Sequence, residues 1–406
     1  MSEELIITFS YYGIGGAQRR AFALADNFAK NGYDVYVAAV LGSDSTITEN
    51  NYYNVDERIK LVLIPDYYDA RKKEKHIVES EEKTKKQISF LKKLQFIFQP
   101  FKKLIKKINY RIDGLRKINP LRAFMLSHKG ATVINFGFNI YDYTYFSTRG
   151  LNCKLVYAET NASNKYSSDK FFEQTKKQIK KSSALIFQTA EEQADHGITG
   201  NKKAFVINNP IKPDLPEPFW GKRNKTIVNF CRLSRQKNLL LLIKAFEKLH
   251  REFKDYKLEL YADTADPNNA LYKKELTDYI CDNGLEDCVF ILPPSQDIHN
   301  VIIKSAMFVS SSDYEGISNS MIEAMAIGLP CVCTDCGGGG AREMITDGEN
   351  GLLVPIGDAD ALKNAMARMI TEKGLAEKCG KNAAEIRNTH SLEKISKKWL
   401  EAIEKV

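Results

Sequence analysis

The sequence predicts an α/β protein of two Rossmann-like domains, each built on a doubly wound parallel sheet. Short apolar runs alternate with helical patterns, and this alternation restarts after a proline-rich stretch near the middle of the chain. A chain of 406 residues, 43% hydrophobic and 27% charged, is also longer than one ordinary core accommodates. We therefore expect two domains that face each other across a cleft, with ligands at the carboxyl ends of the strands.

The first half carries six apolar runs that we expect to be strands. They are LIITFS from Leu5, DVYVAAVL from Asp34, IKLVLIP from Ile59, TVINFGF from Thr132, KLVYAE from Lys154 and ALIFQT from Ala184. Between the first two lies RRAFALADNFAKNG, which has apolar residues at helical spacing and a glycine, Gly32, placed to end the helix. After Asn209-Pro210, the stretch IKPDLPEPFWGKRNK has three prolines and is expected to link the domains.

The second half repeats the pattern with TIVNFCRL, KLELYAD, CVFILPP, AMFVSSS and PCVCTD, each followed by a helix candidate. At the end of the chain, SLEKISKKWLEAIEKV places Leu392, Ile395, Trp399 and Ile403 on one side of an amphipathic helix. The predicted boundaries are 1–212 for the N-terminal domain, 222–385 for the C-terminal domain, and 386–406 for a helix that packs back toward the N-terminal domain.

Basic residues are concentrated in an expected helical insert over about 71–127 of the N-terminal domain. Between Arg71 and Arg122 there are 17 Lys and Arg against 5 Asp and Glu, a local net charge of +12 in a chain whose total is +8. Such a block indicates a localised anionic partner and not general nucleic-acid binding. Within it, SFLKKLQFIFQPFKKLIKKINYRI has apolar residues at helical spacing flanked by lysine pairs, so we expect it to dock on an anionic membrane surface. Alternatively, Pro100 divides this helix, or its apolar stripe packs on the domain.

The start, MSEELIITFSYYG, lacks the positive region of a signal peptide, and no apolar run approaches the roughly 20 residues needed to cross a bilayer. We expect a cytoplasmic protein, peripheral on the inner face of the plasma membrane, whose eight cysteines are free thiols. Cys331, Cys333 and Cys336 have the spacing C-x-C-x-x-C, which raises a metal site as an alternative. We favour a buried strand, because the first two alternate within PCVCT and no second Cys/His group follows at ligand spacing.

Two segments at expected strand ends suit an anionic ligand. In YYGIGGAQRR, the glycines Gly15 and Gly16 allow a close backbone approach, and the helix that follows offers free N–H groups. The spacing is not GxGxxG, and a glycine turn without a ligand is the alternative. In CRLSRQKN, the cations Arg232 and Lys237 suit a leaving diphosphate, although a solvated surface pair is also possible.

The segment SDYEGISNSMIEAMAIGLP is the most specific signal in the chain. Glu315 closes a strand, and Glu323 follows after seven residues on a helix that begins near Ser318. One carboxylate could hold sugar hydroxyls and the other a ribose diol, while the turn could present amides to a phosphate. The residues of that turn are Gly316, Ile317, Ser318, Asn319 and Ser320. As an alternative, Ser320-x-x-Glu323 matches a capping box.

Two further patterns bear on ligands and metals. Four consecutive glycines in TDCGGGGAREM mark a close backbone approach before Glu343, with a flexible surface turn as the alternative. Asp358-Ala359-Asp360 imitates a metal-binding D-x-D, but its position favours a helix N-cap. None of the six histidines lies at metal spacing from another, so we expect no metal and no cofactor.

Together these segments resemble the retaining glycosyltransferases of family four, which have the GT-B architecture. GGAQR is similar to the family's Gly-Gly loop, RLSRQKN to its diphosphate motif, and the two glutamates to its hallmark pair. Gln188-Thr189 and Asn209-Pro210-Ile211 match patterns found before the hinge. The resemblance covers nearly all of the C-terminal half and, more thinly, the N-terminal half.

The resemblance implies a role for each motif. Arg232 and Lys237 would neutralise the diphosphate, Glu315 would bind the donor sugar and Glu323 the ribose. The C-terminal domain would bind the nucleotide sugar and the N-terminal domain the acceptor. Where many relatives have a histidine near the reacting sugar, this chain has Ala158-Glu159-Thr160-Asn161, so Glu159 and Asn161 become the acceptor-side candidates. Pro293 stands where relatives often have a glycine near the base.

The implied function is a retaining, metal-independent hexosyltransferase. It would move a hexose or N-acetylhexosamine from a UDP-sugar to a hydroxyl of a glycan or lipid-linked acceptor in bacterial cell-surface polysaccharide synthesis. The alternative is a catalytically silent nucleotide-sugar-binding or partner-activating subunit of the same fold. The presence of both Glu315 and Arg232 favours the enzyme.

Overall fold

A computed structural model describes residues 3–10, 16–40, 55–64, 120–160, 170–263 and 269–405 of the chain. By their contacts the described residues form two compact units: those within 1–158 and 173–185 form one, and those within 159–172 and 186–405 form the other. Residues 186–211, which the sequence groups with the N-terminal domain, belong by contacts to the second unit.

The first sheet has seven strands in the order β3-β2-β1-β4-β5-β6-β7. Strand β1 pairs in parallel on both sides, with Ile6 opposite Tyr36 on β2 and Val133 on β4. The central runs are apolar without alternation because helices cover both faces of a parallel sheet. The strands are β1 (Glu4–Phe9), β2 (Asp34–Ala39), β3 (Lys60–Leu63), β4 (Thr132–Phe136), β5 (Lys154–Ala158), β6 (Ala184–Phe187) and β7 (Ala204–Val206). The helices are α1 (Gly16–Lys30), α5 (Tyr141–Thr148), α6 (Lys170–Ile179) and α7 (Ala190–Asp195).

The second sheet has six strands in the order β10-β9-β8-β11-β12-β13. Numbered from its own first strand, this is 3-2-1-4-5-6, the order of the dinucleotide-binding Rossmann sheet. The chain starts at β8, winds outward to β10 and then returns to β11, so the order reverses between β8 and β11. The strands are β8 (Thr226–Arg232), β9 (Lys257–Asp263), β10 (Val289–Leu292), β11 (Met307–Ser310), β12 (Cys331–Thr334) and β13 (Leu352–Val354).

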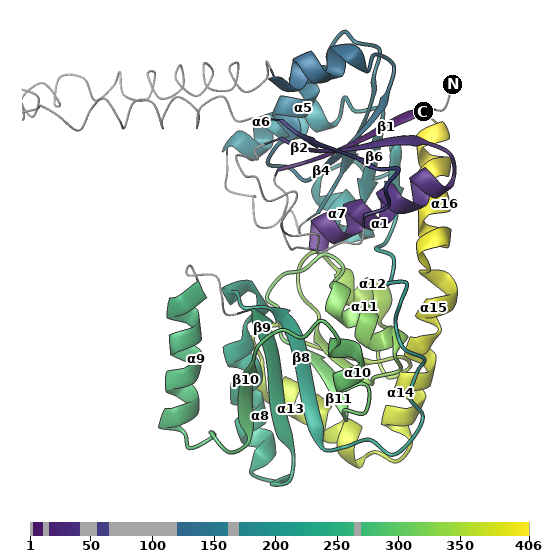
Figure 1. The fold of residues 1–406 in the computed structure, drawn as a ribbon. Coiled ribbons are helices and arrows are strands. Elements are labelled where there is room, and N and C mark those ends of the chain that lie inside the picture. Colours follow the sequence, from purple (N-terminus) through teal and green to yellow (C-terminus); the bar gives the residue numbers. More distant parts are fainter. Residues whose placement is uncertain are drawn as a thin grey trace, which may run out of the picture. The chain divides into compact units, whose positions relative to one another are not determined.

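Helices cover both faces of this second sheet (Figure 1). Two buried clusters separate the faces: Ile227, Leu242 and Met366 belong to one, and Val228, Phe308 and Met325 to the other. The helices of the first face are α8 (Leu239–His250), α9 (Ala270–Asp282) and α13 (Ala359–Thr371). Those of the second are α10 (Ile298–Ile302), α11 (Asn319–Ala326), α12 (Gly340–Met344), α14 (Leu375–Ala384) and α15 (Ile386–Thr389). Since neighbouring residues of β8 enter opposite clusters, both faces of this strand are buried.

The predicted fold class, two parallel-sheet α/β halves, is confirmed, and so is the terminal helix. Helix α16 (Leu392–Glu404) buries Ile395, Trp399 and Ile403 and is capped by Ser391. The sequence did not predict the three-residue strands β7 and β13. The basic insert lies outside the described residues over 71–119, whereas 120–127 are helical. No helix within the described ranges is long and apolar enough to span a membrane.

Candidate functional site

The candidate site lies at the centre of the second sheet, where the strand order reverses. Ligands of open α/β sheets bind outside the carboxyl ends of the strands at such a point. Arg232 is the last residue of β8, and the segment that carries Glu315 follows the neighbouring strand β11. The structure therefore brings together two residues that stand more than eighty positions apart in the sequence.

Lys237 lies on a turn that several hydrogen bonds hold in place. The turn is the short 3₁₀ helix Arg235–Lys237, ended by Asn238 in the left-handed region at a φ of 43°. The Oγ of Ser311 donates to the carbonyl oxygens of Lys237 and Asn238, each at 2.9 Å. In addition, Gln236 Nε2 donates to the Tyr314 carbonyl at 2.8 Å. The backbone that presents Lys237 is thus fixed to the segment that presents Glu315.

Lys237 and Glu315 form an ion pair through Nζ and Oε2, with side chains only 10% and 19% exposed. Burial alone would lower the pKa of Lys237, but the carboxylate of Glu315 outweighs that effect and the pKa is raised. Ser312 Oγ also donates to Glu315 Oε2 at 3.3 Å. A lysine that stays charged and a carboxylate therefore sit together at the reversal point.

Arg232 supplies a second cation to the same place. Its side chain is exposed, and its charge is close enough to Lys237 to oppose the effect of Glu315 on the lysine's pKa. Within the described part of the chain, Arg232 forms no ion pair with a carboxylate. Its guanidinium can therefore receive an anion without first breaking an ion pair.

Glu323 occupies a different environment on α11. The helix begins at Asn319 with Ser318 as its N-cap, so Ser320 lies inside the helix and the capping-box interpretation of Glu323 is wrong. The carboxylate is buried and its Oε2 lies 2.8 Å from His299 Nε2. Sequence reasoning missed His299, because 24 positions separate the two and neither spacing nor motif joins them.

Glycines bring two backbone segments into direct contact beside Glu315. A Cβ added to Gly340 would lie 1.7 Å from the carbonyl oxygen of Gly316 and 2.8 Å from the nitrogen of Ile317. The prediction that the glycine run marks a close backbone approach is confirmed, and what approaches is the chain's own turn before α11. The turn that carries Gly316 is consequently packed against α12 with no room for a side chain.

The peptide groups of Ile317 are held from both sides. Its N–H donates to Gln188 Oε1 at 3.3 Å, and its carbonyl accepts from Asn209 Nδ2 at 3.2 Å. Asn209 Nδ2 also contacts Asn319 Oδ1 at 3.2 Å, and the hydroxyls of Ser318 and Ser320 are 3.0 Å apart. Of the amides predicted to face a phosphate, that of Ile317 is therefore engaged by Gln188 in this structure.

Of the acceptor-side candidates, the structure describes Glu159, which is buried. Glu159 is 1% exposed; its Oε1 accepts from the Thr160 N–H at 2.8 Å, and its Oε2 lies 3.0 Å from Nε2 of the buried His196. Gly16 is exposed at the start of α1. Gly15 and Asn161 lie outside the described residues. The acceptor roles of Glu159 and Asn161 thus stay predictions.

Thiols near the site are in their neutral form. Burial raises the pKa of Cys231 and of Cys336 to about 12, so neither is a thiolate nucleophile at neutral pH. Cys331 and Cys333 lie buried in β12, as predicted. The described ranges contain no cluster of His, Cys, Asp and Glu arranged to hold a metal ion.

The remaining predicted metal motif is structural. Asp358 is the N-cap of α13, and its carboxylate accepts from the Ala361 N–H at 2.8 Å. The N-cap prediction for the D-x-D sequence is therefore confirmed.

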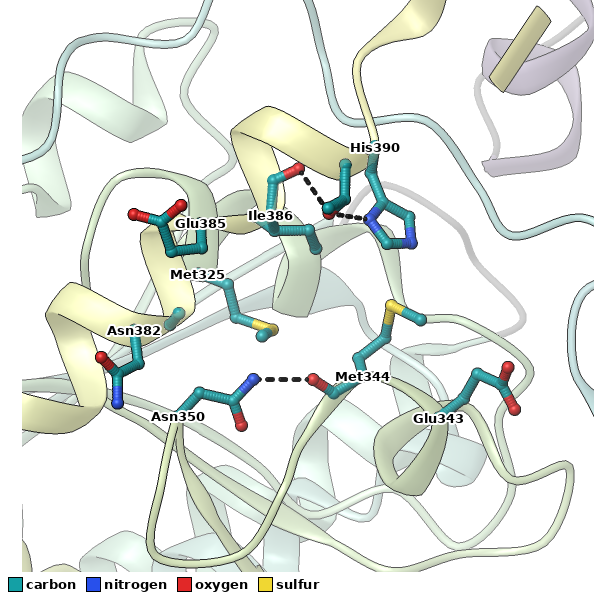
Figure 2. Close-up of a pocket in the computed structure, with 10 residues that line it drawn as sticks. Met325, Glu343, Met344, Asn350, Asn382, Glu385, Ile386 and His390 are labelled. Carbon is teal, nitrogen blue, oxygen red and sulfur yellow. Dashed lines mark hydrogen bonds between the residues drawn. The ribbon is translucent and has the colours of Figure 1, made fainter. Parts of the chain in front are cut away.

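A separate pocket lies among α12, α14 and α15 and is not this site. Its volume is about 170 Å³, below the roughly 300–1,000 Å³ of small-molecule sites. Figure 2 shows the side chains of Met325 and Met344 at its centre, with the carboxylates of Glu343 and Glu385 directed outward. The pocket is too small for a nucleotide sugar, and its methionines offer little to an anion.

Comparison with known proteins finds similarity to glycosyltransferases. Residues 212–386 match the family model "Glycosyl transferases group 1". The chain is 25% identical over 255 residues to the poly(glycerol-phosphate) alpha-glucosyltransferase of Bacillus subtilis, covering 61% of this chain and 37% of that protein. It is 32% identical over 165 residues to the N-acetylgalactosamine-N,N'-diacetylbacillosaminyl-diphospho-undecaprenol 4-alpha-N-acetylgalactosaminyltransferase of Campylobacter jejuni, covering 41% and 42%. The chain thus spans about two fifths of the length of these relatives.

Solved structures match this chain along its length. The structure matches Anabaena HepE, solved with UDP and glucose, with a TM-score of 0.76 and 17% identity over 100% of both chains. At this identity the likeness establishes the fold alone, which is the GT-B fold of two Rossmann-like α/β halves. The matched family segment contains the complete candidate site from Arg232 to Glu323.

Proposed function

We propose that this protein is a retaining, metal-independent glycosyltransferase that uses a UDP-sugar. It moves a hexose or N-acetylhexosamine to a hydroxyl of a glycan or lipid-linked acceptor in bacterial cell-surface polysaccharide synthesis. The observation that carries the proposal is the group of Arg232, Lys237 and Glu315 at the reversal point of the second sheet. A nucleotide sugar has the matching chemistry, since its diphosphate is anionic and its sugar offers hydroxyl donors.

In the proposed reaction the bond between the anomeric carbon and the diphosphate oxygen breaks, and its electron pair goes to that oxygen. Negative charge therefore grows on the diphosphate as the transition state forms. Lys237 and Arg232 stabilise this charge, and the hydrogen bonds of the 235–238 turn hold Lys237 in place before the donor arrives. The acceptor oxygen bonds to the anomeric carbon on the face that the diphosphate leaves, and its proton goes to the departing diphosphate oxygen.

The ion pair between Lys237 and Glu315 couples the two ends of the donor. When the diphosphate binds Lys237, the carboxylate of Glu315 is released to accept hydrogen bonds from sugar hydroxyls. Breaking a buried ion pair leaves each charge without its partner, which costs free energy. The donor must therefore bind Lys237 and Glu315 together. Free UDP, which lacks the sugar to be transferred, would engage the lysine but not Glu315. Glu323, buried on the next helix, accepts from the ribose hydroxyls.

The compared proteins support the donor and the stereochemistry. HepE was solved with UDP and glucose, and the names of both bacterial relatives specify an alpha product. One relative acts on a poly(glycerol-phosphate) and the other on a diphospho-undecaprenol-linked sugar. We transfer the acceptor class from them as a glycan or lipid-linked hydroxyl. Proton NMR of the fresh product should show an α linkage from an α-linked donor, and a β linkage would reject retention.

The alternative, a catalytically silent nucleotide-sugar-binding or partner-activating subunit, predicts binding without turnover. A thermal-shift screen with nucleotide sugars identifies the donor, because a ligand that binds only the folded state raises the melting temperature. The purified protein is then given that donor and an acceptor, with and without EDTA. Our proposal expects transfer at the same rate in both samples. Activity that is lost in EDTA and restored by manganese would reject metal independence, and donor binding without transfer would favour the silent subunit.

We also propose that the basic insert docks the enzyme on the inner face of the plasma membrane. This proposal rests on the sequence, in which Lys92-Lys93, Lys102-Lys103 and Lys106-Lys107 flank apolar residues at helical spacing. Each lysine near anionic lipid contributes about 1 kcal/mol. The wild type should co-sediment with liposomes that contain phosphatidylglycerol, and a variant with these six lysines changed to glutamine should not. Equal sedimentation of both proteins, or none of either, would reject docking.

A further inference from the structure

His299 is a buried residue of the second unit that has no role in the proposed reaction. Its side chain is 7% exposed, and its Nε2 lies 2.8 Å from Oε2 of Glu323, which is 2% exposed. Because a carboxylate oxygen only accepts, Nε2 must carry the proton and donate. Burying a charged side chain costs free energy, so a buried Glu–His pair suggests a functional role.

The imidazole ring is held by aromatic packing from the same strands that carry the site. Phe230 on β8 contacts it edge to face, with ring centroids 5.8 Å apart and an interplanar angle of 86°. Phe230 in turn packs against Phe308 on β11, at 5.4 Å. The ring therefore has a fixed orientation relative to the two strands whose ends carry Arg232 and Glu315.

We propose that His299 is a positioning residue for the nucleotide: it orients the Glu323 carboxylate to accept hydrogen bonds from the ribose diol. This inference rests on the proposed function, in which Glu323 binds the ribose. A carboxylate on a helix can rotate about its side-chain torsions, and a donor fixed on a second element selects one orientation. His299 acts through Glu323 and does not itself touch the donor.

Three variants separate the hydrogen bond from the packing. His299→Phe keeps an aromatic ring against Phe230 but removes the donor. His299→Gln supplies an amide donor of similar reach and serves as the conservative rescue. His250→Phe is the matched control, because His250 also packs beside a phenylalanine, Phe246 at 5.5 Å, but lies at the end of α8.

The readout compares UDP with 2′,3′-dideoxy-UDP, which lacks the ribose diol, by isothermal titration calorimetry. A hydrogen bond to a charged group is worth roughly 1.5–3 kcal/mol, which corresponds to roughly 10- to 150-fold in affinity, so the wild type should bind UDP at least about tenfold more tightly. His299→Phe should lose most of this preference by weakening UDP binding while leaving dideoxy-UDP binding unchanged. His299→Gln should recover part of it, and His250→Phe should match the wild type.

The outcomes distinguish this inference from the proposed function. If His299→Phe keeps the wild-type preference, or weakens both ligands equally, His299 does not position Glu323, although the ribose role of Glu323 stands. If the wild type binds both ligands equally, the ribose role of Glu323 fails and the inference fails with it. If the wild type binds neither, the proposed donor site itself is rejected.

Discussion

Two carboxylates of one short segment differ in what surrounds them. Glu315 follows strand β11, is partly exposed, and pairs with a lysine whose charge persists at any physiological pH. Glu323 lies in the second turn of α11, is almost fully buried, and faces a histidine from another helix. Glu315 is thus held by an ion pair with a lysine, and Glu323 by a hydrogen bond with a histidine.

Under the proposed function, this difference corresponds to a division of tasks along the donor. A carboxylate paired with a permanent cation changes its interactions when an anion takes that cation, which suits the reacting end of a nucleotide sugar. A buried carboxylate with a fixed neutral or charged donor keeps one orientation, which suits recognition of an invariant part such as the ribose.

The largest effect is expected at the lysine. Lys237→Ala removes a preorganised electrostatic group and should lower turnover by about 10²–10³-fold. Arg232→Ala should fall in the same range. Lys248→Ala is the control, since its ion pair with Asp360 is exposed and contributes about 0–1 kcal/mol. Near-normal turnover in Lys237→Ala, measured under saturating donor, would remove the proposed diphosphate site.

The next effect concerns the backbone contact that places the segment. Gly340→Ala would put a Cβ 1.7 Å from the Gly316 carbonyl, so the turn must move, and overpacking typically costs about 1–3 kcal/mol or more. Gly357→Ala is the control: its Cβ meets open space, and its φ of 72° costs only about 1–2 kcal/mol. Urea unfolding should show the larger loss for Gly340→Ala, together with weaker donor binding. Equal losses in the two variants would show that the contact does not matter.

The smallest expected effect is on stability at low pH and comes from His390. Unlike His299, which faces a carboxylate, His390 has neutral hydrogen-bond partners. His390 contacts Thr389 Oγ1 at 2.8 Å and Asn208 Oδ1 at 3.3 Å. Burial, with a smaller contribution from Lys398, lowers its pKa from 6.5 to about 4. In the unfolded chain this histidine binds a proton near pH 6.5, whereas in the folded chain it binds one only near pH 4. The free energy of unfolding therefore falls as the pH drops from about 6.5 to about 4.

His390→Asn should remove that part of the acid sensitivity. Melting temperatures at pH 7 and pH 4.5 should differ less in the variant than in the wild type. An equal acid loss in both proteins would mean that His390 titrates normally in the folded state.

The sequence predicted what local patterns determine. Apolar runs gave most strands, and Arg232 ends a strand as expected. The expectation that Glu315 closes a strand is wrong, because β11 ends at Ser310 and Glu315 lies in the segment that follows it. A ligand at this edge of the sheet stays a prediction. The N-cap at Asp358 and the buried strand at Cys331 followed from their immediate neighbours. Strands β7 and β13, at three residues each, are too short for any periodicity to reveal.

What the sequence did not predict depends on contacts between distant segments. The partner of Glu323 comes from a helix 24 positions earlier, and no pattern around His299 marks it. The pairing of Lys237 with Glu315 spans 78 positions; both were placed at the site, but not against each other. The glycine run was correctly expected to allow a close approach, yet only the structure shows that the approaching group is the backbone of Gly316.

Calorimetric titration of UDP and of the UDP-sugar into two variants tests whether the two glutamates bind different parts of the donor. Glu323→Gln should weaken both ligands by the same factor, because both contain the ribose. Glu315→Gln should weaken only the UDP-sugar and leave UDP equal to wild type or tighter, because it frees Lys237 for the diphosphate. If Glu315→Gln and Glu323→Gln weaken UDP alike, the division of tasks is contradicted.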